Sequence, residues 1–276
     1  LTVLPRPISV TADAQSRVYG DANPSLTYTI GGSGLANGDT LAGALTTGAG
    51  ATSSVGSYAI TQGSLAASTN YSLSFAEGQL QVTPRPLAVT ADSLSRSYGD
   101  TNPDLTYQVG GAGLVNGDSL SGAPASTATA ASSVGSYAIT QGSLAASSNY
   151  SLSFTDGQLQ VMQRPLTVTA ESHSRSYGDA NPELTYQVGG AGLVNGDLLS
   201  GALATEAGTA SPVGSYAIAQ GSLAASSNYS LSFTDGLLQV TQRPIAVTAM
   251  QRTRAFGTAN PELVFAIEQG SLAGGD

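Results

Sequence analysis

The chain of 276 residues has no cysteine and no lysine, a single histidine, and only 10% charged residues. Without cysteine there can be no disulfide, no thiolate nucleophile and no cysteine-bound zinc. Without lysine there can be no lysine Schiff base, no serine–lysine pair and no lysine–asparagine isopeptide bond. The one histidine, His173, limits a Ser–His–Asp triad to a single copy. We therefore expect no enzymatic activity.

Two further classes of partner are disfavoured by what the chain lacks. Nine arginines face 18 acidic residues, giving a net charge of −9 and an isoelectric point near 4.3. Such a chain repels nucleic acid and anionic membrane surfaces. No stretch approaches the roughly 18–20 consecutive apolar residues of a membrane-spanning helix. We expect neither nucleic-acid binding nor direct membrane insertion.

An internal repeat with a period of 79 dominates the sequence. The pair Arg-Pro recurs at this interval, and so do Tyr-Gly-Asp and Asn-Gly-Asp. Residues 85–163 and 164–242 are identical at 64 of 79 positions, and seven of the 15 differences lie between Ser119 and Ser133. We interpret that variable window as a tolerant surface loop. A period this long suits a small autonomous domain better than one solenoid turn.

These positions divide the chain into successive segments. The predicted segments are residues 1–5 as the end of a preceding repeat, 6–84 as repeat 1, 85–163 as repeat 2, 164–242 as repeat 3, and 243–276 as a partial repeat 4. Because both terminal segments are incomplete repeats, we expect the chain to be a piece of a longer protein.

Alternating apolar residues within one repeat predict β-strands. In repeat 1 the predicted strands are 8–12, 26–30, 55–60, 71–75 and 80–82. The sequence Ala76-Glu77-Gly78, which becomes Thr-Asp-Gly in repeats 2 and 3, predicts a hairpin between the last two strands. At most one helical turn is expected, after Asp39. The fold class is therefore all-β or mostly β, in tandem small domains, with an immunoglobulin-like sandwich as the alternative.

The junctions between repeats contain proline and no glycine. Repeat 1 continues into repeat 2 through Thr83-Pro84-Arg85-Pro86, and the later junctions keep Arg164-Pro165 and Arg243-Pro244. Proline fixes its own backbone and keeps the preceding residue extended. We expect a stiff spacer, contacts across each junction that add stability, and a linear array roughly 100–140 Å long.

The ordered motifs resemble a known family of repeats. Arg-Pro-Leu-x-Val-Thr-Ala, Tyr-Gly-Asp-x-Asn-Pro-x-Leu-Thr-Tyr, Gly-Leu-x-Asn-Gly-Asp, Val-Gly-Ser-Tyr-Ala-Ile and Asn-Tyr-Ser-Leu-Ser-Phe together resemble MBG-type repeats of the YGX variety. This resemblance implies β-grasp-like modules in very large bacterial surface proteins, including filamentous-haemagglutinin-like adhesins of two-partner secretion. It implies an extracellular location, on the bacterial surface or in the biofilm matrix. In the fourth copy, Phe256 and Thr258 replace the Tyr and Asp of the motif.

The only candidate ligand positions lie in the Tyr-Gly-Asp-x-Asn-Pro loop. Side-chain oxygens of aspartate and asparagine suit Ca²⁺, which takes six to eight oxygen ligands. The same residues also close Asx turns, for which no metal is needed. The calcium candidates are Asp21, Asn23, Asp100, Asn102, Asp179 and Asn181. No other cofactor is expected. His173 aligns with Gln15 and Leu94 and is interpreted as a surface residue.

Two functions are compatible with these observations. The first is a structural stalk that extends an adhesive region away from the cell and whose partners are the neighbouring repeats. The second is a multivalent module that binds exopolysaccharide or a surface protein weakly at each repeat. In the second case the variable loops, or the tyrosines stacked on sugar rings, are the candidate contacts.

Overall fold

The computed structural model describes residues 1–274, and these form 23 β-strands and no helix. The prediction of an all-β chain of small tandem domains is confirmed. No described helix offers the length and apolarity that a membrane crossing requires. The chain divides into two compact units, one of residues 1–95, 102–128 and 136–160 and the other of residues 96–101, 129–135 and 161–276. The boundary between them runs through repeat 2.

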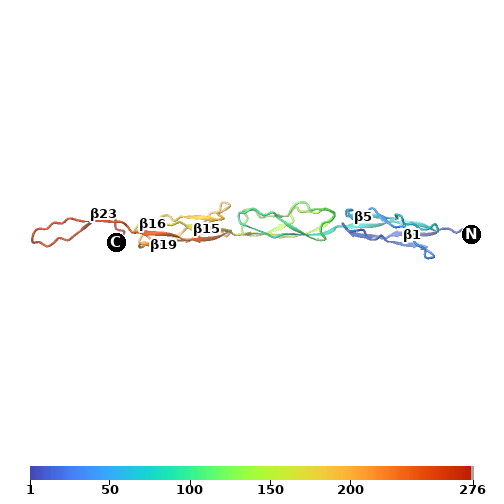
Figure 1. The fold of residues 1–276 in the computed structure, drawn as a ribbon, viewed down its shortest axis with the longest axis horizontal. Helices are drawn as coiled ribbons and strands as arrows, with labels where there is room; N and C mark the ends of the chain where they lie inside the picture. The colour runs from blue at the N-terminus through green and yellow to red at the C-terminus, as the bar shows by residue number, and fades with distance from the viewer. Residues whose placement is uncertain (275–276) are drawn as a thin grey trace. The chain divides into compact units, whose positions relative to one another are not determined.

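Repeat 1 consists of two mixed β-sheets (Figure 1). The first sheet has the order β3-β1-β6, with β3 antiparallel and β6 parallel to β1. The second has the order β2-β7-β5-β4, with β2 parallel and β5 antiparallel to β7. The strand bounds are β1 Arg6–Ala12, β2 Gln15–Val18, β3 Tyr28–Gly32, β4 Thr46–Thr47, β5 Gly56–Thr61, β6 Tyr71–Ala76 and β7 Gly78–Thr83. Parallel pairs set these sheets apart from the antiparallel sheets of an immunoglobulin sandwich.

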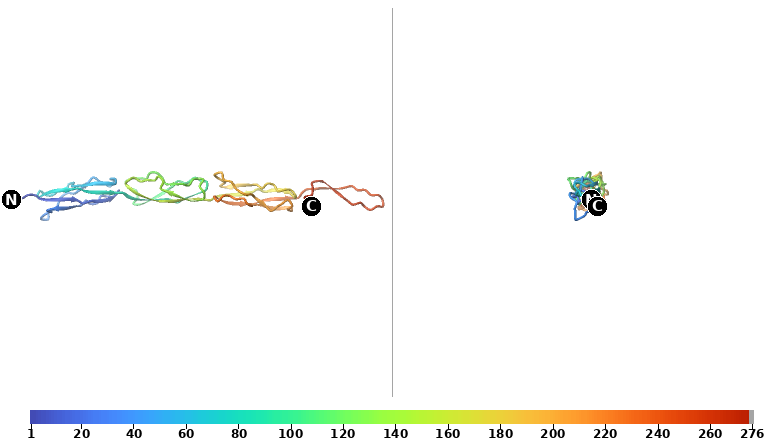
Figure 2. Two further views of the ribbon diagram at one scale, coloured as in Figure 1. Left: turned by 180° about the vertical axis from the view of Figure 1, so that it is seen from behind. Right: turned by 90° about the vertical axis from the view of Figure 1, so that its right-hand side faces the viewer.

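Two runs of chain pass from the first sheet to the second. One is β1 followed by β2, and the other is β6 followed by β7. The two runs are parallel, since Arg6 pairs with Tyr71 at one end and Val18 pairs with Thr83 at the other. The chain therefore enters a repeat at one end and leaves it at the opposite end (Figure 2).

The core of repeat 1 lies between the two sheets. Ile8 and Val10 of β1 are buried, as are Leu80 and Val82 of β7 and Ile60 of β5. These residues alternate with exposed or half-buried serine, threonine and glutamine, as the period of two in the sequence predicts. Because alternate side chains of a strand point to opposite faces, the apolar side chains fill the space between the two sheets and the polar ones face outward.

The predicted hairpin between β6 and β7 is wrong. The two strands lie in different sheets, and Gly78, the first residue of β7, is extended and buried. A Cβ atom at Gly78 would lie 2.6 Å from the carbonyl oxygen of Ala12. Glycine is therefore needed here for close backbone packing where the chain changes sheet, and not for a turn.

The remaining differences concern short elements. Strand β2 was not predicted, and β3 begins two residues later than the predicted strand at 26–30. No helical turn follows Asp39; instead Asn37 and Gly38 both have positive φ, 57° and 77°, in a tight turn closed by Asp39 N–H to Ala36 O. This geometry is that of a type I′ turn, for which Asn-Gly is the favoured sequence.

Repeats 2 and 3 have the same arrangement of strands. Their sheet orders are β10-β8-β13 with β11-β12-β14-β9, and β17-β15-β20 with β16-β21-β19-β18. The bounds in repeat 2 are β8 Arg85–Ala91, β9 Leu94–Ser97, β10 Tyr107–Gly111, β11 Ala125–Ser126, β12 Gly135–Thr140, β13 Tyr150–Thr155 and β14 Gly157–Met162. Those in repeat 3 are β15 Arg164–Ala170, β16 His173–Ser176, β17 Tyr186–Gly190, β18 Ala204–Thr205, β19 Gly214–Ala219, β20 Tyr229–Thr234 and β21 Gly236–Thr241.

The described part of repeat 4 is a two-stranded sheet. Strand β22 (Ala246–Ala249) pairs antiparallel with β23 (Phe265–Gln269). This pair corresponds to β15 and β17 of repeat 3. Among the described residues no strand lies on the other edge of β22, the position that β20 occupies beside β15.

Candidate functional site: the junctions between repeats

The first junction lies within the first unit and has an aromatic pair at its centre. Tyr19 follows β2 and lies at the end of repeat 1 that contacts repeat 2. It meets Tyr150, at the start of β13, edge to face, with ring centroids 5.6 Å apart and an interplanar angle of 78°. Both side chains are buried. Val82 of repeat 1 and Leu87 of repeat 2 belong to the same hydrophobic cluster. The two repeats therefore share a continuous core at this junction.

Asp118 connects the two tyrosines. The Tyr150 hydroxyl donates to Asp118 Oδ2 at 2.8 Å, and the Tyr19 hydroxyl donates to the same oxygen at 3.1 Å. The Tyr150 hydroxyl also accepts a hydrogen bond from the Val115 N–H at 3.0 Å. Asp118 is the last residue of the Asn-Gly-Asp motif, so this motif supplies a junction contact in addition to its turn.

Arg85 connects the same two repeats at the periphery. Its Nη1 donates to Tyr19 O at 3.1 Å and forms an ion pair with Asp21 Oδ1 at 2.9 Å. Its Nε donates to Gly113 O at 3.2 Å, and its Nη2 donates to Ala112 O at 3.0 Å, both within repeat 2. A partly exposed ion pair contributes at most about 1 kcal/mol. The guanidinium matters more as a planar group that satisfies carbonyls on both sides of the junction.

Two backbone features complete the first junction. The Val55 N–H donates to Asn149 Oδ1 at 2.9 Å, directly beside Tyr150. Gly20 has a φ of +83°, and a Cβ atom there would lie 2.4 Å from a methyl group of Val115. The Gly of Tyr-Gly-Asp is therefore required both for the turn and for close approach of the next repeat.

The second junction lies within the second unit and repeats these contacts. Tyr98 and Tyr229 meet at 5.6 Å and 81°. Arg164 pairs with Asp100 at 2.8 Å, and the Val134 N–H donates to the side-chain oxygen of Asn228 at 3.0 Å. The expectation of contacts across the junctions is confirmed at both places.

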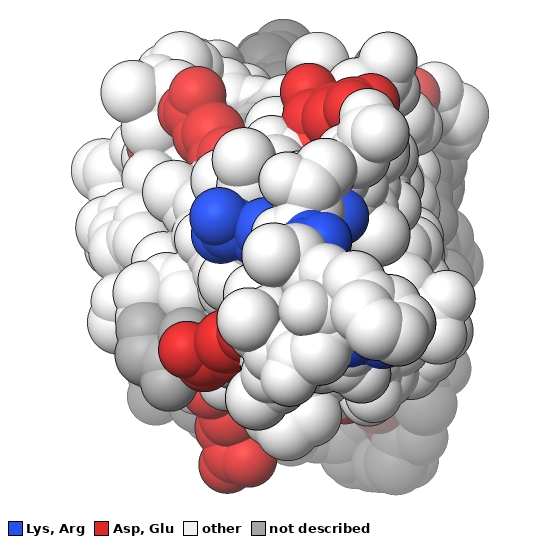
Figure 3. Space-filling view, turned by 90° about the vertical axis from the view of Figure 1, so that its left-hand side faces the viewer, with Lys and Arg blue, Asp and Glu red and all other residues white. Residues whose placement is uncertain are grey.

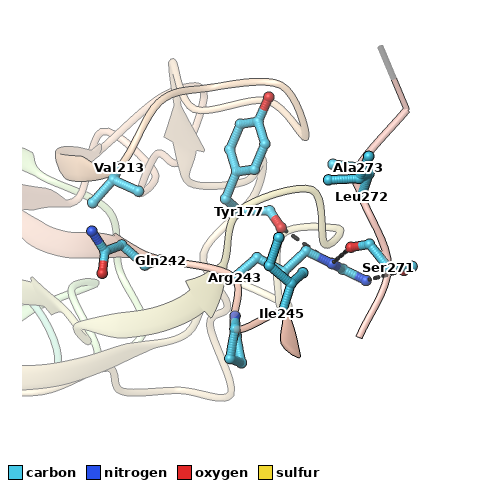
Figure 4. Close-up of a pocket in the computed structure, with 9 residues that line it drawn as sticks. Tyr177, Val213, Gln242, Arg243, Ile245, Ser271, Leu272 and Ala273 are labelled. Carbon is cyan, nitrogen blue, oxygen red and sulfur yellow. Dashed lines mark hydrogen bonds between the residues drawn. The ribbon is translucent and has the colours of Figure 1, made fainter. Parts of the chain in front are cut away.

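At the third junction, also within the second unit, the described residues supply the arginine contacts. Arg243 pairs with Asp179 at 2.7 Å, donates to Tyr177 O at 3.1 Å, and donates through Nε to Ser271 O at 2.8 Å. In Figure 4 the Arg243 side chain lies between Tyr177 and Ser271. A cavity of about 660 Å³ opens beside it, lined also by Val213 and Ile245.

Burial raises the pKa of the Tyr150 hydroxyl; the Val115 N–H lowers it by less, and the bond to the Asp118 carboxylate raises it further. Burial raises the pKa of Tyr229 in the same way. Above about pH 10 an unfolded tyrosine ionises while these two stay protonated. The folded state then binds more protons than the unfolded state, so its stability falls as pH rises.

We therefore expect the titration of these two groups to leave the free energy of unfolding unchanged below about pH 9 and to decrease it above about pH 10. Urea titrations at several pH values would measure this decrease. The double variant Tyr150→Phe/Tyr229→Phe should flatten it, although the variant is less stable at neutral pH. An unchanged alkaline slope in this variant would show that other groups are responsible.

The six calcium candidates are all engaged by protein groups. Asp21, Asp100 and Asp179 each pair with a junction arginine. Asn23 Oδ1 accepts from Arg17 Nε at 2.7 Å, and Asn23 Nδ2 donates to Ala49 O at 2.6 Å. Asn181 makes the same two bonds, and Asn102 donates to Ala128 O at 2.6 Å. In repeats 1 and 3, the aspartate and the asparagine that were predicted as ligands of one calcium ion thus bond to two different arginines.

The sequence did not reveal the role of the arginine in the short strand β2 and its counterparts. Arg17, Arg96 and Arg175 are the buried charged residues among those described. In addition to the asparagine, Arg17 donates to Val18 O at 3.2 Å and to Gly50 O. This buried arginine holds the asparagine of the Tyr-Gly-Asp-x-Asn-Pro loop, called the Asn-Pro loop below, against the second sheet. The available signal in the sequence was the alternating pattern Ser-Arg-Val or Ser-Arg-Ser, in which the arginine occupies the position that faces inward.

The remaining candidates form no common site. His173 is half-buried in β16 and lies 3.1 Å from the Thr185 hydroxyl. Hydrogen bonds from Thr185 and Gln187 lower the pKa of Glu171 beside it. Among residues 1–274 no cluster of three or more acidic or histidine side chains is arranged to hold a metal ion. On the face drawn in Figure 3, acidic and basic groups are few and are separated by uncharged residues.

Some of the residues that were candidate contacts for a polysaccharide or a surface protein belong instead to strands, to the core or to the junctions. Within the variable window Ser119–Ser133, residues 125–126 form strand β11 and Ala128 belongs to the core. Tyr19 and Tyr98, with Tyr150 and Tyr229, are buried in the junctions. These four rings are not available to stack on sugars.

Of three comparisons with known proteins, the one with family models gives a match that covers most of the chain. The model for the MBG domain (YGX type) matches residues 8–81, 87–160 and 166–239. No curated protein sequence matches the chain. Among solved structures, the chain is similar to the N-terminal eight Ig domains of Down Syndrome Cell Adhesion Molecule isoform 1.30.30, with 12% identity and a TM-score of 0.17. That match covers 97% of this chain and 45% of the other, and so low a score carries no argument. Each family match covers nearly all of one repeat, and the chain therefore belongs to the MBG domain (YGX type) family, with three domains in tandem.

Proposed function

We propose that this chain is a structural spacer in a large bacterial surface or biofilm-matrix protein, with no catalytic activity of its own. The observation that supports the proposal is the recurrence of one set of junction contacts. A tyrosine pair, an arginine–aspartate pair and an asparagine bonded to a backbone N–H recur at both junctions between complete repeats. Contacts of this kind resist bending at the point where tandem domains otherwise hinge.

The path of the chain within a repeat also favours a spacer. About 13 residues run from Arg6 to Val18, which at roughly 3.3 Å per residue advances the chain by about 40 Å. Each repeat therefore adds length along its own strands. Extra copies would change the reach of an adhesive region without changing any chemistry.

Small-angle X-ray scattering of the whole chain tests the proposal. A compact chain of this length has a radius of gyration near roughly 19 Å, and an array with stiff junctions should exceed roughly 30 Å. We expect a radius above the second of these values, unchanged when calcium is chelated. A radius equal to that of the compact chain would refute the spacer, and a decrease on chelation would make calcium a structural ligand.

The alternative, a multivalent binder of polysaccharide, makes a different prediction. Weak sites in three repeats would give measurable avidity for the matrix polysaccharide. The spacer proposal expects no such binding by this chain, because its partners are the neighbouring repeats and adhesion belongs to other regions. Glycan-array binding by the whole chain would favour the alternative.

A further inference from the structure

We infer that Asn116, in the Asn-Gly turn at the first junction, is a site of spontaneous deamidation whose isoaspartate product loosens the contact between repeats 1 and 2. The modification is intramolecular and needs only water as a co-reactant. The inference does not depend on the spacer function. It rests on the turn that precedes Asp118, the residue whose carboxylate accepts from both junction tyrosines.

The reaction uses atoms of the turn itself. The backbone nitrogen of Gly117 gives up its proton and forms a bond to the side-chain carbon Cγ of Asn116, while the bond from Cγ to the side-chain nitrogen breaks. That nitrogen leaves with the proton as ammonia, and a five-membered succinimide remains. Water then opens the ring at either carbonyl and gives aspartate or isoaspartate. One water is consumed, one ammonia is released, and nothing is oxidised or reduced.

Both reacting groups are accessible. Asn116 and Gly117 are exposed, and a Cβ atom at Gly117 would meet no other atom within 4 Å. Among residues 1–274 the Asn116 amide has no hydrogen-bond partner, and the Gly117 N–H donates to no acceptor. Neither protein packing nor a competing hydrogen bond therefore holds the two groups apart.

The turn also permits the rotation that the reaction requires. Asn116 and Gly117 have φ of 56° and 78°, the geometry of a type I′ turn. Rotating the peptide group between them converts the turn to type II′, in which the first central residue keeps a φ of about 60°. This rotation turns the Gly117 nitrogen toward the Asn116 side chain. Only the φ of Gly117 changes sign, and glycine adopts either sign at little cost.

The other asparagines of the chain lack one or more of these features. Four of the ten precede proline, whose nitrogen carries no proton to lose, and three precede tyrosine. Of the latter, Asn149 is also held, since its Oδ1 accepts from the Val55 N–H at 2.9 Å. The remaining two precede glycine as Asn116 does. In the second of these, Asn195, the side-chain nitrogen donates to Ala130 O at 3.4 Å.

Isoaspartate at position 116 would act directly on the junction. It adds one methylene to the backbone inside a four-residue turn, which the Asp118 N–H closes by donating to Val115 O at 3.0 Å. The lengthened turn cannot hold Asp118 Oδ2 at its distances of 2.8 and 3.1 Å from the hydroxyls of Tyr150 and Tyr19. Two hydroxyls of buried tyrosines then lose their shared acceptor, which is unfavourable for the contact between the repeats.

The test is to age the whole chain in neutral buffer at physiological temperature and to follow each asparagine by peptide mapping with mass spectrometry. Electron-transfer fragmentation separates isoaspartate from aspartate. We expect the amide of Asn116 to be lost at least about tenfold faster than those of Asn102 and Asn149. Equal rates at the three positions would overturn the inference.

Hydrogen exchange of the modified fraction, separated by anion exchange, tests the effect on the junction. Exchange in residues 150–155 should be at least about fivefold faster than in the fresh chain. Asn116→Gly is the matched control, because Gly-Gly also favours a type I′ turn and has no amide to lose. After the same ageing this variant should keep its original exchange in residues 150–155. Unchanged exchange in the modified fraction, or the same acceleration in the aged variant, would contradict the effect on the junction.

Discussion

Replacing Tyr150 with alanine is expected to lower the free energy of unfolding by about 3–5 kcal/mol, the usual cost of removing a large buried aromatic side chain. The ring packs against Tyr19 of the preceding repeat and belongs to a cluster that includes Val82 and Leu87. The change also removes the hydroxyl that Asp118 and the Val115 N–H share. The loss should therefore appear in both repeats 1 and 2.

Hydrogen exchange measured by mass spectrometry can locate this loss. We expect faster exchange in residues 78–83 of repeat 1 as well as in residues 85–91 and 150–155 of repeat 2. The chain offers a matched control in Tyr71, the counterpart of Tyr150 in repeat 1. Tyr71 bonds to Asp39 and to the Ala36 N–H but has no partner ring among the described residues. Tyr71→Ala should cost only about 1–2 kcal/mol. Equal costs at the two positions would show that Tyr150 stabilises only its own repeat.

Replacing Arg175 with methionine should destabilise repeat 3 by roughly 3 kcal/mol or more. The guanidinium donates to Asn181 Oδ1 at 2.7 Å, to Ser176 O at 3.1 Å and to Gly208 O. Methionine keeps much of the volume but leaves these acceptors without their donor in a buried place. A domain the size of one repeat has a total stability of only about 4–12 kcal/mol, so this is a large fraction.

The counterpart of Arg175 in the partial repeat provides the control. Arg254 is exposed and donates to Thr258 O at 2.9 Å. Arg254→Met should change stability by less than about 0.5 kcal/mol. Thermal unfolding with hydrogen exchange over residues 164–242 would measure both variants. A small effect of Arg175→Met would mean that water replaces the guanidinium and that the Asn-Pro loop needs no buried cation.

The alternation of apolar and polar residues in the sequence predicted several of the strands. The alternation in residues 8–12, 55–60 and 71–75 located β1, β5 and β6, because a half-buried strand has a period of two. The regular recurrence of the motifs gave the tandem arrangement. The resemblance of those motifs to YGX-type repeats agreed with the family match.

What the sequence could not predict depends on pairing between distant segments. The Asp-Gly turn signal at Asp156-Gly157 suggested a hairpin, yet β13 and β14 belong to different sheets. Each parallel pair joins a strand near the start of a repeat to one near its end, as β1 with β6 and β2 with β7. Four tyrosines pack across the junctions between repeats rather than within one repeat. No local periodicity distinguishes these two kinds of burial.

The parallel pairing within a repeat has a mechanical consequence. When a repeat is pulled by its two ends, tension reaches β1 from one direction and β7 from the other. Because β1 lies parallel to β6, and β7 parallel to β2, the load slides each strand lengthwise along its neighbour. The hydrogen bonds of a sheared pair resist together, whereas those of a peeled hairpin break one after another. Rupture under tension is governed by the unfolding rate. A domain with no disulfide can therefore withstand traction through the direction of its strands alone.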